Sequence, residues 1–325
     1  MAINVTYTGG VIAVREKSLL KDKLLRMAEL TAEEAFRMLL ESGYGGGELV
    51  ANVYVYEKLV KREESLVDDF IREYAPSKTE RAYFLAPRDF HNLKALLKAD
   101  YLGEDAEKLL APEGEIPVKV LQNAVKEKDF APLAEYNPVL KETAEAALAL
   151  FDGENPSGAE IGAVFEKANA EYLFAVTKKN PTLRKLFVQK IDMTNILTTF
   201  RASDFEIAES KYLPRGSVSK EKLERLLSEN REIAVKALKG TPYDSFVSLC
   251  FQAKDKGLPM TTAEKAIESL ETEYFHEKRF DLKNKDPFLY YILRRKTENA
   301  NVRIVFVCKL AGLSEQDVKR RLRAL

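Results

Sequence analysis

A short polar pattern recurs three times along this chain at nearly equal intervals. In each copy an acidic residue stands three positions before an asparagine, and an aliphatic residue follows that asparagine directly; no other asparagine meets both conditions. The three pairs are Asp89 with Asn92, Asp192 with Asn195, and Glu298 with Asn301. The asparagines lie 103 and 106 residues apart in a chain of 325 residues, which predicts one structural unit used three times.

The sequence around each asparagine repeats as well. A residue typical of helix N-caps stands fifteen positions before each one, at Ser77, Asn180 and Asp286. Clusters that contain proline and glycine, which stop helices, follow the first two asparagines after about 20 residues, at 112–117 and 214–217. We therefore expect three similar helical domains with tight junctions, at residues 1–113, 114–215 and 216–325.

Helix signals dominate the rest of the chain, so we expect an all-α fold. Four pairs have capping-box spacing, namely Thr31 with Glu34, Ser77 with Glu80, Thr261 with Glu264, and Ser314 with Asp317. Two stretches rich in β-branched and aromatic residues, 3–7 and 53–56, are short for strands, and we expect helical segments there. Pro87 should end or kink its helix and start a new one near Arg88.

Composition narrows the classes of function. The chain is 46% hydrophobic and 31% charged, as in soluble globular proteins, and its 51 basic and 51 acidic residues leave no net field to attract nucleic acid or an anionic membrane. Apolar stretches fall short of the roughly 20 residues that span a bilayer, so no direct membrane span is expected. The N-terminal ten residues do not resemble a secretion signal, which favours the cytoplasm, where Cys250 and Cys308 should be inert buried thiols.

Motifs of catalysis and cofactor binding do not appear. The nearest candidate phosphate loop is the glycine-rich stretch 43–47, but Glu48 follows it where a lysine is needed, so it should be a helix C-cap and loop. Its secondary use would be a hinge or a close backbone contact with a partner. His91 and His276 have no partners at metal-ligand spacing. The paired acids at 63–64 and 68–69 should form a solvated helix face. We expect no enzyme activity, no cofactor and no metal.

The repeated acid and asparagine allow two interpretations. Because the two side chains are neighbours on a helix, they could form polar bonds inside or between the units, which would compensate for a poor mid-helix residue. Alternatively, the three helices could surround a shared axis and face a partner. The candidate partner contacts would then be the basic residues just past the asparagines, Lys94, Lys98, Arg201 and Arg303. The basic stretch 319–323 should be a cationic helix end that complements the helix macrodipole. The second interpretation is that it binds an anionic surface of a partner.

The segment from Asp286 to Glu315 resembles the closing segment of the C-type rotor component of rotary V/A-type ATPases, the homologue of the eukaryotic d component. The shared features are a proline-led helix with paired aromatic and aliphatic residues, the acid, asparagine, aliphatic and arginine core at 298–303, and a Lys-Leu-x-Gly-Leu turn at 309–313 before a final basic helix. The resemblance extends weakly over the whole chain through Asn92 and Asn195.

This resemblance implies an all-helical, funnel-shaped protein of three similar domains in a pseudo-threefold arrangement. It implies a noncatalytic rotor part, present once per complex on the cytoplasmic face of the membrane. Its partners would be the central-stalk axle subunits of D and F type and the proteolipid ring, and it would transmit torque for ATP-linked proton or sodium transport. The residues alone also allow a generic helical scaffold or adaptor, or an enzyme with an unrecognised site.

Overall fold

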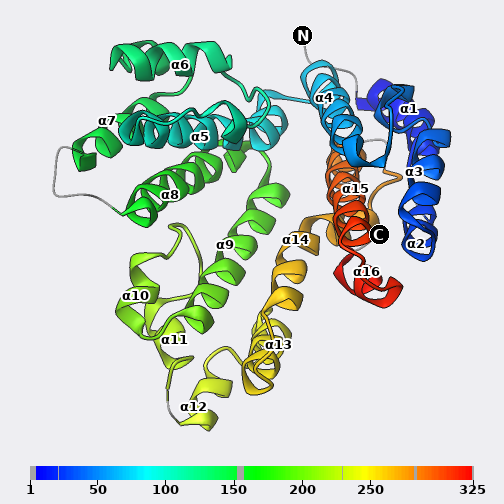
Figure 1. The fold of residues 1–325 in the computed structure, drawn as a ribbon. Coiled ribbons are helices and arrows are strands. Elements are labelled where there is room, and N and C mark those ends of the chain that lie inside the picture. Colours follow the sequence, from blue (N-terminus) through cyan, green and yellow to red (C-terminus); the bar gives the residue numbers. More distant parts are fainter. Residues whose placement is uncertain (1–4, 21, 152–156, 229, 282–283, 324–325) are drawn as a thin grey trace. The chain divides into compact units, whose positions relative to one another are not determined.

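The computed structural model describes residues 5–20, 22–151, 157–228, 230–281 and 284–323, and all regular elements in these ranges are helices (Figure 1). The predicted all-α fold is confirmed. The chain forms two compact units, which we call unit 1 (residues 1–81 and 268–325) and unit 2 (residues 82–267). The three-domain boundaries, the pseudo-threefold arrangement and the funnel shape stay predictions.

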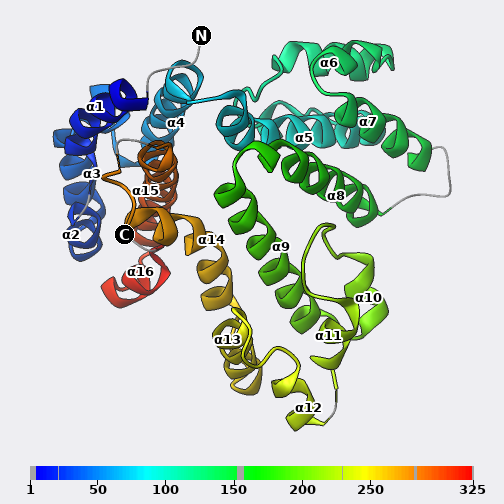
Figure 2. The same ribbon diagram turned by 180° about the vertical axis from the view of Figure 1, so that it is seen from behind.

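Unit 1 combines helices from both ends of the sequence. Its helices, apart from the short 3₁₀ turns, are α1 (Val5–Arg15), α2 (Lys23–Glu29), α3 (Ala32–Glu41), α4 (Tyr56–Tyr74), α15 (Asp286–Leu310) and α16 (Glu315–Arg321). Figures 1 and 2 both show α15 beside α4, and α15 also contacts α1, α2, α3 and α16. The long helix α15 therefore forms the centre of this unit.

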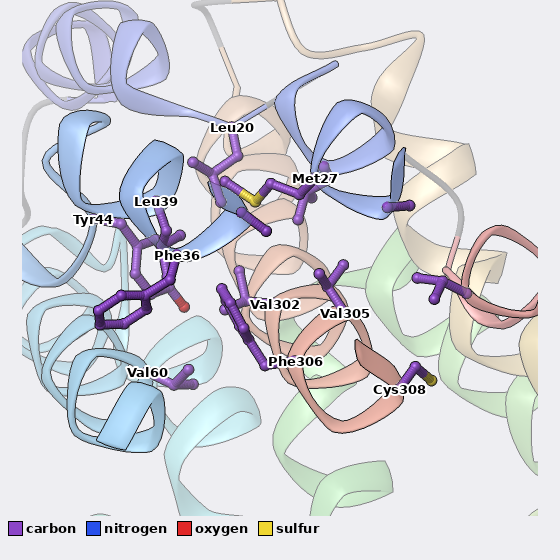
Figure 3. Close-up of a cluster of buried hydrophobic side chains, with 14 of the residues drawn as sticks. Leu20, Met27, Phe36, Leu39, Tyr44, Val60, Val302, Val305, Phe306 and Cys308 are labelled. Carbon is purple, nitrogen blue, oxygen red and sulfur yellow. The ribbon is translucent and has the colours of Figure 1, made fainter. Parts of the chain in front are cut away.

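The core of unit 1 explains why α15 is buried on several sides. Val302, Val305 and Phe306 of α15 meet Met27 of α2 and Phe36 of α3 (Figure 3), and all five side chains are at most 7% exposed. The rings of Phe36 and Phe306 pack edge to face, with centroids 6.0 Å apart. Apolar burial on this scale is the main force that holds the two ends of the sequence together.

Unit 2 contains the middle of the chain. Its helices are α6 (Val118–Glu127), α7 (Pro138–Phe151), α8 (Gly158–Val176), α9 (Pro181–Arg201), α10 (Phe205–Ser210), α11 (Lys220–Arg225), α12 (Arg231–Lys236) and α13 (Asp244–Asp255), while α5 (Lys78–Leu102) and α14 (Thr261–His276) cross its boundaries. A continuous core joins α5, α6, α7 and α8, with Leu93, Leu121, Leu140 and Phe165 almost fully buried.

The helix starts predicted from the repeated caps and the capping boxes are accurate to about one residue. Asn180 caps α9 by accepting from the Leu183 N–H at 3.1 Å, and Ser77 directly precedes α5. Asp286, predicted as a cap, is instead the first residue of α15, because the side chain of Asn284 accepts its N–H and starts the turn earlier. Thr261 is likewise the first residue of α14, so this helix begins one position earlier than the capping box predicts.

The prediction of a helix break at Pro87 is wrong, because α5 runs from Lys78 to Leu102 with Pro87 inside it. Proline removes one backbone hydrogen bond, but the neighbouring side chains Leu85, Phe90 and Leu93 are at most 2% exposed. Burial on both sides of the proline keeps the helix continuous. The two stretches rich in β-branched residues are helical as expected where the structure describes them: α1 covers residues 5–7, and a 3₁₀ turn at Val53–Val55 leads into α4. Residues 3 and 4 of the first stretch lie outside the described ranges.

None of the helices in the described ranges is both long and apolar enough to cross a membrane.

Candidate functional site

Each motif asparagine binds one residue of a later segment through both of its polar side-chain atoms. On α5, the Asn92 amide donates to the Ala111 carbonyl at 3.2 Å and accepts from the Ala111 N–H at 2.8 Å. On α9, Asn195 binds Leu213 in the same way, at 2.9 and 2.8 Å. We call each of these paired bonds a clamp, because it fixes an irregular segment to the middle of a long helix.

The α15 clamp follows the same geometry in unit 1. The Arg323 N–H donates to the side-chain oxygen of Asn301 at 2.7 Å, and the amide of Asn301 donates to the Arg323 carbonyl at 3.4 Å. All three asparagines are at most 5% exposed, so an unpaired amide would carry a desolvation cost of about 1–3 kcal/mol. The three side chains therefore serve the fold within the unit to which each belongs.

The motif acids of α5 and α9 hold the continuation of the same segments. Asp89 accepts from the N–H groups of Glu115 and Ile116 at 3.0 and 3.2 Å, four and five residues past the residue clamped by Asn92. Asp192 accepts from the N–H groups of Ser217 and Val218 at 2.7 and 3.0 Å, at the same offset past Leu213. The repeated pattern thus extends from the helices into the segments 111–116 and 213–218.

A glycine in each clamped segment allows this close approach. Gly114 and Gly216 both lie three residues past the clamped residue, directly after a Pro-x pair. A Cβ atom on Gly216 would lie 2.6 Å from the Asp192 carboxylate, and one on Gly114 would overlap the Asp89 carboxylate and lie 2.8 Å from the Leu85 carbonyl. Both stretches were predicted only as helix breaks, although their shared Pro-x-Gly spacing marks them as matching parts of the repeat.

Further neutral donors surround Asp192. The hydroxyls of Ser217 and Tyr243 each donate to its Oδ2 at 2.5 Å. Burial and the hydrogen bond to the carboxylate raise the pKa of the Tyr243 phenol well above its ordinary value. The sequence did not indicate that Ser217 and Tyr243 bind Asp192. Tyr243 lies 51 positions from this partner and carries no motif of its own.

Glu298 has a different set of partners. It accepts from the N–H of Leu20 at 2.5 Å and pairs with Arg295 at 2.9 Å. Arg295 also contacts Glu63 at 3.4 Å, and all three ionisable residues are at most 6% exposed. Burial raises the pKa of Glu298, while the neighbouring Arg295 opposes that shift.

The expectation of a solvated acidic face on α4 is therefore wrong for two of its four acids. Glu63 is 6% exposed and Asp68 is 3% exposed. Glu63 faces Arg295 of α15 and accepts from the Gly45 N–H at 3.0 Å. A pairing between residues 232 positions apart could not be seen in the local charge pattern of α4.

The glycine-rich stretch 43–47 forms the predicted helix end and loop. Its four glycines have φ values between +70° and +76°, which residues with side chains rarely adopt. A Cβ on Gly45 would lie 3.1 Å from the Leu59 carbonyl, so the loop backbone lies directly against α4. This close backbone contact is made within unit 1, and the hinge or close contact with a partner foreseen for the stretch stays a prediction.

The four candidate interface cations fall into two groups. Lys94, Lys98 and Arg201 line one cavity of about 460 Å³ in unit 2, between α5, α8 and α9. Arg303 lies in unit 1, where its guanidinium pairs with Glu57 and Glu64 of α4, each at 2.7 Å. Arg201 also has an acidic partner, Glu264 at 2.5 Å.

The remaining candidate residues are buried or contact other residues of the same chain. Cys250 and Cys308 are free and buried, as predicted, and burial raises the pKa of the Cys250 thiol to about 12. The ring of His91 lies 3.0 Å from the Leu109 carbonyl. Within the described ranges, no group of three or more histidine, cysteine or acidic side chains could hold a metal ion. Lys319 of the basic C-terminal stretch pairs with Glu29 and Glu315, each at 2.7 Å.

These observations define an all-helical protein whose repeated polar motif fixes irregular segments to long helices. Comparison with known proteins identifies the group more closely. The family model described as ATP synthase (C/AC39) subunit matches residues 9–321, and the chain belongs to this family. The family resemblance stated from the sequence is confirmed.

Individual relatives agree with this assignment. The C-type component of the V-type ATP synthase of Thermus thermophilus is 27% identical over 266 residues, which cover 79% of this chain and 82% of the relative. The C-type component of the A-type ATP synthase of Methanosarcina mazei is 25% identical over an alignment of 354 residues, which covers 96% of this chain and 90% of the relative.

Proposed function

We propose that this chain is the noncatalytic C-type component of a V/A-type rotary ATPase. It would form a rotor socket that couples the central axle to the membrane proteolipid ring and transmits torque during ATP-linked proton or sodium transport. The observation that carries the proposal is the family match across residues 9–321, together with bacterial and archaeal relatives that are both named as the C-type part of an ATP synthase.

The clamps supply a physical property that such a part needs. A protein that passes torque between two partners must resist deformation of its irregular segments, which are normally its softest parts. Here the segments 111–116 and 213–218 are each fixed to a long helix by an asparagine and an aspartate. Torque applied to these segments would pass directly into α5 and α9.

The proposed partners are the axle subunits of D and F type and the proteolipid ring, with one copy of the chain per complex on the cytoplasmic face of the membrane. The candidate contacts on this chain are Lys94, Lys98, Arg201 and Arg303. Arg303 already forms two ion pairs with α4, so a partner would have to share or replace them. Lys94 and Lys98 form no ion pair among the described residues, so they are better placed to meet an external group.

Partner identification tests this proposal. The tagged full-length chain would be expressed in its source cells, purified from detergent-solubilised membranes, and its partners identified by mass spectrometry. We expect the axle subunits and the proteolipid to be recovered together. A partner set lacking both, with an intact ATPase in the same extract, would contradict the rotor role and favour the helical adaptor.

A matched pair of charge changes would then examine the contacts. The charge reversal Arg201→Glu should weaken recovery of the axle subunits if Arg201 meets a partner. Lys126→Glu on the exposed face of α6 should leave recovery unchanged. Equal recovery with both variants would remove Arg201 from the interface without affecting the assignment to the complex.

A further inference from the structure

The cavity in unit 2 has an excess of positive charge. Four cationic side chains line it, from Lys94 and Lys98 of α5, Arg201 of α9, and Lys211 of the segment that follows α10. In the part of the chain that the structure describes, Glu166 of α8 is the one carboxylate in the lining. Arg201 has a further acidic partner in Glu264, but Lys94 and Lys211 have no ion pair among the described residues.

The arrangement of the two lysines on α5 adds to this excess. Lys94 and Lys98 are one helical turn apart and therefore lie on the same face. The ammonium group of Lys98 donates to the Gly158 carbonyl at 2.6 Å, which fixes it at the cavity wall. Burial, followed by the charge of Lys94, lowers the pKa of Lys98. A bound anion would relieve this repulsion between like charges.

The cavity wall supplied by α8 leaves room for a ligand. It is formed by the small residues Gly158, Ala159, Gly162 and Ala163 at the start of α8. A Cβ atom on Gly162 would meet nothing within 4 Å, so the space beside it is open. A volume of about 460 Å³ lies within the usual range of small-molecule sites, roughly 300–1,000 Å³.

We propose that this cavity binds a small multivalent oxyanion, such as an oligophosphate or a polycarboxylate, through Lys94, Lys98, Arg201 and Lys211. The proposal does not rest on the rotor role, although Lys94, Lys98 and Arg201 are also the candidate partner contacts named above. Leu213, whose backbone is clamped by Asn195, also lines the cavity. A bound anion would therefore stabilise the α9 clamp and also relieve the repulsion between the cationic side chains.

The proposal is tested by isothermal titration calorimetry on the purified full-length chain, with pyrophosphate and citrate as the two probes. Lys94→Gln with Lys98→Gln should weaken binding by about tenfold or more, because charge-assisted contacts are lost. The control Lys119→Gln with Lys126→Gln makes the same charge change on α6, away from the cavity, and should leave the affinity unchanged. The probe that binds more tightly identifies the preferred class of anion.

A second variant separates loss of binding from loss of structure. Gly162→Glu introduces a carboxylate into the open space and replaces glycine by a better helix former, so the variant should fold and lose anion binding. The proposal is overturned if neither anion binds the wild-type chain, if the pocket variants bind as tightly as wild type, or if the α6 control weakens binding equally.

Discussion

The α9 and α15 clamps share an asparagine geometry but differ in what their acids hold. Asn195 and Asn301 each bind the N–H and carbonyl of one residue, 18 and 22 positions downstream respectively. Asp192 then holds Ser217 and Val218 of the same downstream segment, whereas Glu298 holds Leu20, 278 positions upstream. The asparagine therefore has a local partner in both places, while the partner of the acid depends on the tertiary structure.

The electrostatic surroundings of the two acids differ accordingly. Asp192 is satisfied by backbone N–H groups and two neutral hydroxyls. Glu298 depends on the buried guanidinium of Arg295, which also contacts Glu63. Loss of one buried charge should consequently harm the α15 clamp more than loss of a neutral donor harms the α9 clamp.

The largest expected effect comes from Arg295→Met. This change leaves Glu63 and Glu298 buried without their cation, and we expect a loss of about 3–5 kcal/mol in the free energy of unfolding, measured with urea. The control Arg320→Met removes an exposed partner of Asp317 and should cost less than about 1 kcal/mol. Similar small losses for both variants would show that the α15 clamp does not depend on buried charge.

Gly114→Ala examines the close approach in the α5 clamp. The new methyl group would overlap the Asp89 carboxylate, and we expect a loss of about 3 kcal/mol from overpacking. Gly162→Ala, in open space on α8, should instead stabilise the chain by about 0.5–1 kcal/mol. Urea denaturation measures the free energy of unfolding of both variants. A Gly114→Ala variant as stable as wild type would mean that the segment 111–116 is not held tightly against α5.

Asn195→Ala and Asn301→Ala compare the shared part of the two clamps. Each change leaves a partly buried N–H and carbonyl without their partner, so we expect losses of about 2 kcal/mol that agree between the variants. Asn123→Ala on the exposed face of α6 is the control and should be neutral or slightly stabilising. A large loss at only one of the two clamps would show that they are not equivalent.

The smallest expected effect concerns the buried thiol of α13 in unit 2. Since burial raises the pKa of Cys250 to about 12, its stabilising contribution is complete below the ordinary thiol pKa of about 8.5 and is lost as the pH rises toward 12. Between pH 7 and pH 9, wild type should lose about 1 kcal/mol more than Cys250→Ala. If wild type and Cys250→Ala lose equal free energy of unfolding over this pH range in urea titrations, the thiol lies in a more hydrated site.

Sequence alone predicted the features that depend on local chemistry. Helix starts at Asn180 and Ser77 follow from capping, and the repeated asparagines mark the middle of three long helices. The helix through Pro87 was missed, because local propensity opposes it and burial of its neighbours decides the outcome.

Features that depend on distant partners were not predictable. Nothing near Glu63 indicates that Arg295 will neutralise it, and nothing near Leu20 indicates that it will meet Glu298. The grouping of Lys94 and Lys98 with Arg201 is an intermediate case. Their place after the motif asparagines was visible in the sequence, but the cavity that joins them requires α8 to supply a wall of small residues.

Coupled ion pumping tests the central claim most directly. Membrane vesicles containing the ATPase would be prepared with and without this chain, and ATP hydrolysis and ion uptake would be measured together. The proposed rotor role predicts that vesicles without the chain hydrolyse ATP but do not pump, and that adding the full-length chain restores pumping. Undiminished ATP-driven pumping in its absence would contradict the rotor role.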